Sequence, residues 1–267
     1  LVENYLTYAF NLGNHNLSAL AGHSYQKIFV HGTNTSINRF PISGIEPMYN
    51  PGYGQELTLA GNRPGGYAFI NELQSFFGRV NYELNNKYLL TANFRADGSS
   101  KFGANNKYGY FPSFSFGWRI SEEAFMEELP FSNLKLRAGW GRTGNQEIPP
   151  KATQALFNSL VTAGVSYPLN PAPPYPAGNV YARLANPFLQ WESSAQTNVG
   201  LDFGFFNGAL SGSVDRFFKT SNNILLEVPP ADPVQPAGTL WANIEDMQIV
   251  NNGWEFDAEY NHHSENG

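Results

Sequence analysis

Three carboxylates near the end of the chain have a spacing that is compatible with acid and base chemistry. Glu255, Asp257 and Glu259 alternate with apolar residues, so on a β-strand all three lie on one face. Residues two apart on a strand are separated by about 7 Å, within the carboxylate separation of inverting glycosidases. Any strand with one wet face has this spacing, so we interpret the three as a solvated face. An all-β glycosidase is the alternative, and it requires Glu255 or Asp257 to be essential for hydrolysis.

A second motif matches the sequence of a dinucleotide-binding loop but lacks the helix that must follow such a loop. Residues 139–144 read G-x-G-x-x-G, but this motif holds pyrophosphate only when a helix begins directly after it. Pro149 and Pro150 follow here, so we expect glycines at the end of a strand. The sequence therefore predicts no nucleotide cofactor.

The side chains that bind metals are scattered along the chain. There is no Cys, and the five histidines are His15, His23, His31, His262 and His263. Only the last two adjoin, and neighbours on a strand point to opposite faces. The segment at residues 97–100 (DGSS) has too few oxygen ligands for calcium and predicts a turn. We therefore expect no metal and no cofactor.

Three tyrosines are candidates for contact with another molecule. Tyr167, Tyr175 and Tyr181 lie in or beside a Pro-rich stretch. Exposed aromatic rings of this kind stack on sugars or bind a peptide or a covering protein. Packing of the loop on itself is the alternative.

The composition limits the classes of protein that the chain can represent. It has 267 residues, of which 42% are hydrophobic, 15% aromatic and only 14% charged, with a net charge of −6. There is no block of Lys or Arg, which argues against a nucleic-acid partner. No apolar run approaches the roughly 20 residues of a membrane-spanning helix. The absence of Cys leaves the compartment open.

The elements that position all these residues are predicted to be strands. Runs of about ten residues alternate apolar with polar side chains and end at Gly, Asn or Asp. The predicted strands cover residues 3–12, 16–27, 71–85, 87–98, 110–121, 133–142, 195–206, 209–219 and 249–261. Tight turns alternate with long Gly- and Pro-rich connections, which is typical of outer-membrane barrels with periplasmic turns and long extracellular loops.

The alternation predicts one face in lipid and one in water. The apolar parity includes Leu90, Phe94, Phe116 and Trp140. The side chains predicted to face the lumen are Arg79, Asn81, Glu83, Asn93, Arg95, Arg119, Lys135, Arg137, Asp202, Glu255, Asp257 and Glu259. An Arg or Lys on the lipid face costs about 2 to 4 kcal/mol at the bilayer midplane, which explains the sorting.

Two local features complete the prediction. The segment at residues 121–129 (SEEAFMEEL) predicts a short periplasmic helix capped by Ser121. Arg216 breaks the sorting, because it shares its parity with Leu210 and Val214. Three explanations are open for Arg216: a place near the outer interface, a side chain that extends toward water, or a β-bulge.

Several long motifs resemble one known family. They are residues 88–103 (YLLTANFRADGSSKFG), 109–123 (GYFPSFSFGWRISEE), 133–146 (NLKLRAGWGRTGNQ), 191–192 (WE), 196–204 (QTNVGLDFG) and 251–255 (NNGWE). Their order and spacing resemble the SusC/RagA-type TonB-linked outer-membrane transporters of Bacteroidetes. The resemblance covers most of the chain.

The resemblance implies a specific fold and role. The fold would be an all-β, antiparallel transmembrane β-barrel segment, about nine strands of a 22-stranded barrel with long extracellular loops. Residues 1–267 would be a C-terminal barrel portion, with no plug domain, TonB-contacting segment or signal peptide, in an outer membrane like that of Bacteroidetes. The whole transporter would import glycans or peptides with a SusD-like surface lipoprotein and TonB-ExbB-ExbD, without enzymatic activity. The alternative is a soluble all-β carbohydrate-binding module, whose apolar face would be a sheet core.

Overall fold

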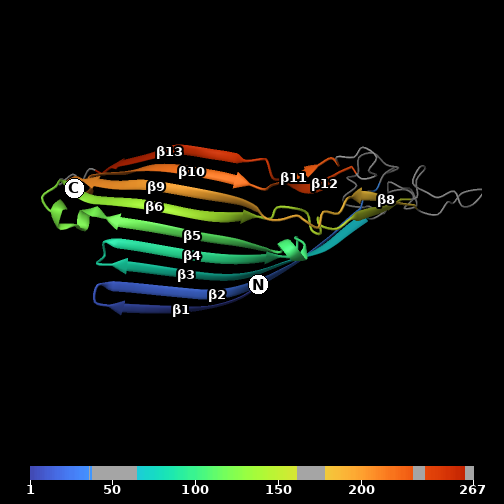
Figure 1. The fold of residues 1–267 in the computed structure, drawn as a ribbon, viewed down its shortest axis with the longest axis horizontal. Helices are drawn as coiled ribbons and strands as arrows, with labels where there is room; N and C mark the ends of the chain where they lie inside the picture. Colours follow the sequence, from blue (N-terminus) through green and yellow to red (C-terminus); the bar gives the residue numbers. More distant parts are fainter. Residues whose placement is uncertain (36, 38–64, 161–177, 231–237, 262–267) are drawn as a thin grey trace, which may run out of the picture. The chain divides into compact units, whose positions relative to one another are not determined.

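The computed structural model describes residues 1–35, 37, 65–160, 178–230 and 238–261. Nine strands form one antiparallel sheet in the order β1-β2-β3-β4-β5-β6-β9-β10-β13 (Figure 1). The strands are β1 (Val2–Leu12), β2 (His15–Asn34), β3 (Gly65–Leu84), β4 (Tyr88–Ser99), β5 (Tyr108–Arg119), β6 (Phe131–Asn145), β9 (Glu192–Phe205), β10 (Leu210–Asn222) and β13 (Ile249–Tyr260). All nine predicted strands are confirmed, and consecutive strands of this sheet are neighbours throughout.

The connections between these strands alternate in length as predicted. The tight turns contain residues that tolerate a positive φ, including Gly13 (56°), Asn85 (55°) and Asn207 (53°). Figure 1 shows the turns between β3 and β4 and between β9 and β10 at one end of the strands, and the hairpin of β11 and β12 at the other. The ends of the sheet therefore differ: one carries tight turns and the other carries folded connections.

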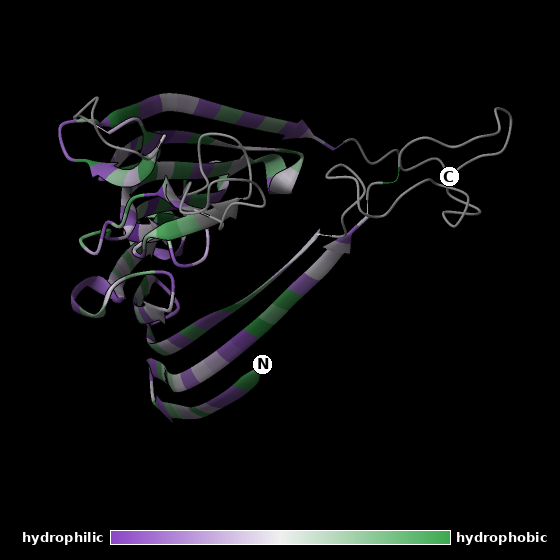
Figure 2. Ribbon diagram, turned by 90° about the vertical axis from the view of Figure 1, so that its right-hand side faces the viewer, coloured by the Kyte–Doolittle hydropathy of each residue, from purple (hydrophilic) through white to green (hydrophobic). Residues whose placement is uncertain are grey.

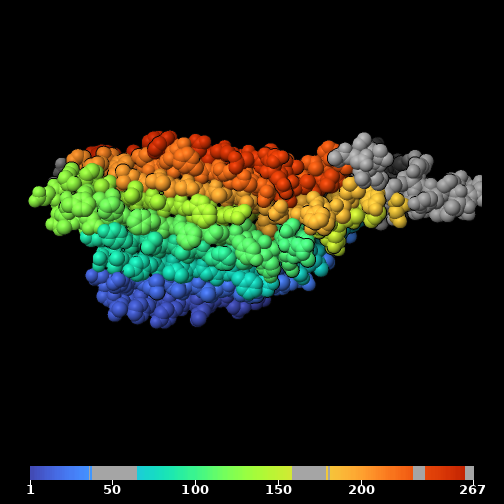
Figure 3. Space-filling view, viewed as in Figure 1, coloured from blue at the N-terminus to red at the C-terminus, as the bar shows by residue number. Residues whose placement is uncertain are grey.

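Alternation along each strand is visible in the distribution of hydropathy. Hydrophilic and hydrophobic residues form successive bands along the strands (Figure 2). In the space-filling view, neighbouring strands lie against each other without interruption from β3 to β10 (Figure 3). Each strand thus pairs laterally while it presents two chemically different faces.

Strands β2 and β3 are longer than the sequence pattern predicts. They extend to Asn34 and from Gly65, whereas we expected a connection over about residues 28–70. The segment Lys27–Asn71 forms a compact unit of its own. Within it, a Cβ at Gly32 would lie 2.7 Å from the ring of Tyr67, so this glycine makes room for an aromatic side chain on the neighbouring strand.

The long connections contain two hairpins that the sequence did not reveal. Strand β7 (Leu156–Leu160) pairs with β8 (Gly178–Arg183), and β11 (Ile224–Val228) pairs with β12 (Leu240–Ile244). These strands have only five or six residues each. Because Pro and Gly residues are frequent around them, the sequence predicts loops at these positions. No helix among the described residues has the length and apolarity to cross a membrane.

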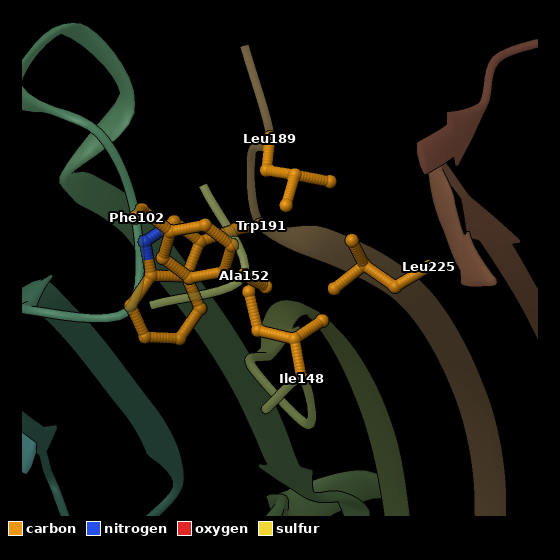
Figure 4. Packing of buried hydrophobic residues seen from close by; sticks show 6 residues of the cluster. All are labelled: Phe102, Ile148, Ala152, Leu189, Trp191 and Leu225. Carbon is orange, nitrogen blue, oxygen red and sulfur yellow. The ribbon is translucent and has the colours of Figure 1, made fainter. Parts of the chain in front are cut away.

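A small hydrophobic core joins the long connections at the end of the sheet opposite to the tight turns. Its buried members are Phe102, Ile148, Ala152, Leu189, Trp191 and Leu225 (Figure 4). The ring centroid of Trp191 lies 5.1 Å from that of Phe102, and its Nε1 donates to the carbonyl of Lys107 at 3.1 Å. Three connections, between β4 and β5, between β6 and β9, and between β10 and β13, are therefore held together by shared apolar burial rather than by strand pairing.

The predicted helix over residues 121–129 is wrong. The structure has two single 3₁₀ turns, η5 (Ile120–Glu122) and η6 (Ala124–Met126), and Ser121 does not cap a helix. The reason lies at Glu123, whose carboxylate accepts bonds from Lys87 Nζ (2.9 Å) and Tyr88 OH (2.7 Å). Glu123 also accepts a bond from Trp118 Nε1 at 3.1 Å, and its extended backbone separates the two turns.

These three donors lower the pKa of Glu123 to about 2, with the bond from Lys87 as the largest cause. Because this pKa lies below the ordinary 4.5, Glu123 stabilises the fold above pH 4.5, and that stabilisation is lost as the pH falls toward 2. We predict that Glu123→Gln lowers the apparent melting temperature of the intact protein at pH 7. The difference from wild type should shrink between pH 4.5 and pH 2 in a series of melting curves.

The exposed neighbour Glu122 provides the matched control. Glu122→Gln removes the same charge from the adjacent position and should leave the melting temperature unchanged at pH 7. A difference between Glu123→Gln and wild type that stays constant down to pH 2 would show that the ionised carboxylate is not the stabilising group.

Candidate functional site

All twelve side chains predicted to share a wet environment lie on one face of the nine-stranded sheet, here called the polar face. Directly paired residues of antiparallel strands have side chains on the same face. Arg79 pairs with Asn93, Lys135 with both Arg119 and Asp202, and Ser213 with both Asp202 and Asp257. Continuous pairing carries this parity across the sheet, so Arg79, Arg95, Arg119 and Arg137 share one face with Asp202 and with the three carboxylates of β13.

The opposite face, here called the apolar face, carries large aliphatic and aromatic side chains. Leu90, Phe116 and Ala138 pair in one row, and Phe114 pairs with Trp140, whose rings stack with centroids 6.1 Å apart. Phe114 is 56% exposed, although it lies in the middle of the sheet. No second layer among the described residues covers this face, since the other two sheets are the two-stranded hairpins.

A charge cluster on β6, β9 and β10 lies on the polar face. Nη2 of Arg137 lies 2.7 Å from Asp202 and 2.9 Å from Asp215. Gly200 pairs with Arg137 on one side and with Asp215 on the other, and a Cβ at Gly200 would lie 2.9 Å from Arg137 Nη2. This glycine lets the guanidinium reach both carboxylates. Our sequence analysis missed Asp215. The alternation of β10 was a usable signal, because Asp215 lies on the face opposite to Leu210, Val214 and Arg216.

Amides and hydroxyls form a second network on β2 to β5. Asn81 donates to Ser18 Oγ at 3.2 Å and accepts from Thr91 Oγ1 at 3.0 Å. Glu83 lies 3.8 Å from Arg119, which also donates to the carbonyl of Asn86. The polar face therefore offers both hydrogen-bond donors and acceptors along its length.

The three carboxylates of β13 lie on the polar face as predicted, but they do not form a catalytic pair. Glu255, Asp257 and Glu259 are all exposed on the edge strand of the sheet. Opposite them are Asp215, Ser213 and Ser211. The general acid of a glycosidase lies in a secluded environment, whereas these three carboxylates are exposed.

The remaining motifs have structural positions. The G-x-G-x-x-G segment lies inside β6, and a loop follows it. Asp97 and Ser99 belong to the end of β4, so the predicted turn begins only at Ser100, and Asp97 pairs with Arg95 at 2.7 Å. No group of three or more metal-ligating side chains occurs among the described residues. His262 and His263 lie outside those residues.

One of the three candidate tyrosines lies in the described part of the chain. Tyr181 is on β8, 39% exposed, with its ring 4.5 Å from that of Phe157 on β7. Its contact with Phe157 is the loop packing that we considered as the alternative, although much of the ring stays accessible. Tyr167 and Tyr175 lie outside the described residues.

Arg216 lies on the apolar face without a β-bulge. The pairing of β10 is continuous from Leu210 to Ser221 against both neighbours, so the bulge explanation is wrong. Its guanidinium lies 4.3 Å from the ring of Phe218 and 5.3 Å from that of Trp254. It also donates to Asn252 at 2.9 Å. The charge is thus directed along the sheet toward the end with the long connections, which fits a side chain that extends toward water.

Comparison with known proteins places this geometry in a family. The family described as TonB dependent receptor-like, beta-barrel matches residues 2–264. The chain belongs to this family. It is 37% identical to TonB-dependent receptor P3 of Formosa agariphila over 96% of this chain and 24% of that protein. It is 40% identical to TonB-dependent receptor SusC of Bacteroides thetaiotaomicron over 61% of this chain and 16% of SusC.

Solved structures agree with the sequence relatives. A structure of the RagAB peptide importer matches 99% of this chain and 28% of that chain, with a TM-score of 0.81 and 26% identity. The siderophore receptor PirA of Pseudomonas aeruginosa, 14% identical with a TM-score of 0.54, shares the fold. The chain spans about a quarter of the length of the first curated relatives it matches.

Family membership decides between the hypotheses drawn from the sequence. The all-β fold is a segment of a TonB-dependent receptor barrel, and the resemblance to SusC/RagA-type proteins is confirmed. TonB-dependent receptors are transporters rather than enzymes, so the glycosidase hypothesis has no support. The soluble carbohydrate-binding module has none either, since its apolar face would need a covering layer.

The cluster at Arg137 generates a stability prediction. Arg137→Gln leaves Asp202 and Asp215 facing each other, so we expect a loss of about 1 kcal/mol, the upper range for exposed pairs, because the Arg137 side chain is 38% exposed. The measurement is the midpoint of unfolding of the intact protein by guanidinium chloride in detergent. Lys135→Gln is the control, because Lys135 has no ion pair within the described ranges. Equal midpoints for the two variants would contradict the role of the cluster.

Proposed function

We propose that this chain forms part of the barrel wall and outer loops of a TonB-dependent outer-membrane importer. In this proposal the apolar face contacts lipid and the polar face lines the aqueous interior. The observation that carries it is the sorting of side chains across a continuous antiparallel sheet that belongs to a receptor family. Residues 1–267 would be barrel throughout, and the complete receptor would supply the plug domain and TonB-contacting segment.

The dimensions of the strands support a membrane-spanning role. Strands of 11 to 15 residues, such as β1 and β6, are long enough to cross the hydrocarbon core, which takes about 9 to 11 residues of a strand tilted at about 45°. The exposed rings of Phe94 and Phe114 lie on the face that would contact lipid. Lipid contact removes the large free-energy cost that exposure of such a face to water would carry.

The edges of the sheet support membership of a larger closed barrel. Among the described strands, β1 and β13 each have one neighbour in the sheet, so within this part of the chain one row of their backbone groups has no strand beside it. Unpaired backbone groups cost several kcal/mol each in hydrocarbon, and barrels avoid this cost by closure. Further strands of the complete receptor would pair with these two edges.

The residue roles follow from this orientation. The twelve side chains predicted from the sequence would face the lumen: Arg79, Asn81, Glu83, Asn93, Arg95, Arg119, Lys135, Arg137, Asp202, Glu255, Asp257 and Glu259. The end of the sheet with β7, β8, β11 and β12 would be extracellular, with Tyr167, Tyr175 and Tyr181 as contacts for cargo or for a covering lipoprotein. The relatives in Formosa and Bacteroides support an outer membrane of the Bacteroidetes kind.

The cargo and partners are carried over from relatives. The solved RagAB structure is that of a peptide importer, which supports a peptide cargo, and the resemblance to SusC/RagA-type transporters implies a glycan or a peptide. The proposal therefore includes a glycan or peptide substrate, a SusD-like surface lipoprotein and energy coupling through TonB-ExbB-ExbD.

Growth of the source bacterium tests this function. Deletion of the gene for the complete receptor should abolish growth on one peptide or oligosaccharide supplied as the limiting nutrient, because the outer membrane excludes it. The intact gene should restore growth, and should fail to do so in a strain without TonB. Unchanged growth on every nutrient tested, or restoration without TonB, would contradict the proposal.

A further inference from the structure

The apolar face has a polar pocket at the end of the sheet that carries the long connections. The pocket has a volume of about 180 Å³. Its lining includes Tyr108 and Tyr110 of β5 and Arg142 of β6, which all lie on the parity of the apolar face. Sites for drug-sized ligands have roughly 300–1,000 Å³, so this smaller pocket suits a single headgroup of a larger molecule.

The pocket lies where β5 and β6 stop pairing with each other. Their register ends with Ser113 opposite Gly141, although both strands continue beyond this pair. The ring of Trp191 adjoins both strands there, since a Cβ at Gly109 of β5 or at Gly144 of β6 would lie 3.0 Å from it. Aromatic packing therefore takes the place of strand pairing at this point, and the pocket lies beside it.

Arg142 supplies a positive charge that no described residue neutralises. Its Nη2 donates to Oγ of Ser193 at 2.9 Å, and it forms no ion pair within the described ranges. Arg142 pairs with Ala195, and Ser193 lies two residues nearer the long connections, so this bond directs the guanidinium toward that end of the sheet. A guanidinium has five N–H donors, and one bond leaves most of them available to a ligand.

Aromatic residues locate the pocket relative to the apolar face. On β5, Trp118 stacks with Tyr88 near the tight turns, and Tyr110 stacks with Phe94 near the long connections. Tyr110 lies eight residues before Trp118, which is about 27 Å along a strand and about 20 Å along the membrane normal at a tilt of about 40°. Aromatic residues of membrane barrels border an apolar band about 25 Å tall. Tyr110 therefore marks one border of this band, and the pocket lies at the level of lipid headgroups.

The other polar groups around the pocket are neutral. Four of the lining residues have amide side chains, namely Asn105, Asn106, Gln190 and Asn223, and Arg142 is the only charged residue in the lining. A guanidinium is well suited to bind phosphate, whereas amides both donate to and accept from hydroxyl groups. This combination matches a headgroup in which a phosphate is attached to a sugar.

We propose that the pocket binds the phosphorylated sugar headgroup of a lipid in the outer leaflet, with the phosphate on Arg142. The proposal rests on the function proposed above, since it requires the apolar face to contact the bilayer. The acyl chains would lie along this face on the bilayer side of Tyr110, where Phe94 is 50% and Phe114 is 56% exposed. A bound lipid would also cover the point where β5 and β6 separate.

Native mass spectrometry of the purified intact receptor with lipids added in neutral detergent tests this site. The probes are monophosphoryl lipid A, the same lipid without its phosphate, and phosphatidylglycerol, which has a phosphate but no sugar. Monophosphoryl lipid A should bind about tenfold more tightly than its dephosphorylated form, because it makes charge-assisted bonds to Arg142. Phosphatidylglycerol should bind more weakly than monophosphoryl lipid A, because it lacks the sugar hydroxyls.

Three variants locate the interaction. Arg142→Gln should weaken monophosphoryl lipid A about tenfold and leave the dephosphorylated lipid unaffected. Arg142→Lys keeps the charge without the planar fork of donors, so its affinity should lie between those of wild type and Arg142→Gln. Lys219→Gln is the matched control. Lys219 pairs with Gln196, next to the Ala195 partner of Arg142, but it lies on the polar face, so this variant should bind all three lipids as wild type does.

Several results would overturn the proposal. Equal affinity for the phosphorylated and dephosphorylated lipids, or an equal loss with Lys219→Gln, would do so. Phosphatidylglycerol bound as tightly as monophosphoryl lipid A, or displacement of the lipid by inorganic phosphate at equal concentration, would exclude a phosphorylated sugar headgroup. An equal loss in Arg142→Gln and Arg142→Lys, with a lowered melting temperature in both, would assign Arg142 to the fold rather than to lipid.

Failure of this site is distinguishable from failure of the importer proposal. Lipid binding in detergent needs neither TonB nor cargo, and Arg142→Gln should still restore growth of the deletion strain. Absence of lipid binding with growth restored would refute the lipid site alone. Growth that does not depend on the receptor or on TonB would contradict the importer proposal instead.

Discussion

Lateral hydrogen bonding between neighbouring strands is the interaction on which the rest of this structure depends. The hydrocarbon core of a bilayer contains no water to satisfy backbone N–H and C=O groups, so each strand must pair with the strands beside it. Strand β10 illustrates this: its pairing runs without a shift from Leu210 to Ser221 against both β9 and β13. The one irregularity in the pairing of β6 with β9 lies beside the turn, between Phe131 and Asn133.

Continuous pairing fixes which face of the sheet each side chain lies on. The face in turn determines whether an apolar or a polar side chain is favoured at that position. A slip of one residue would move Arg137 to the face of Phe116 and Trp140. The sheet therefore gathers most of its charges on one face, where Arg137 bridges two aspartates. Arg216 shows the cost of an exception, because two aromatic rings and Asn252 are needed to accommodate it.

Prediction from the sequence succeeded where one local pattern determines the structure. Period-two alternation and Gly or Asn turns predicted all nine strands of the sheet and the shared face of residues as distant as Arg79 and Asp257. Prediction failed where contacts distant in sequence decide. The bonds of Lys87, Tyr88 and Trp118 to Glu123 prevent the expected helix, and burial of Trp191 with Phe102 and Leu225 organises the connections. Neither interaction leaves a periodic trace in the sequence.

Spin labels on adjacent residues of β5 test the central claim most directly. Residues 1–267 contain no Cys. Two variants of the intact receptor, Phe116→Cys and Ser115→Cys, therefore each add one attachment site to this part of the chain, on the apolar face and on the polar face respectively. In reconstituted membranes, collisions with oxygen should broaden the signal of the label at position 116, and a water-soluble nickel chelate should affect position 115. The reverse accessibilities, or equal exposure of both labels to the nickel chelate, would contradict the account.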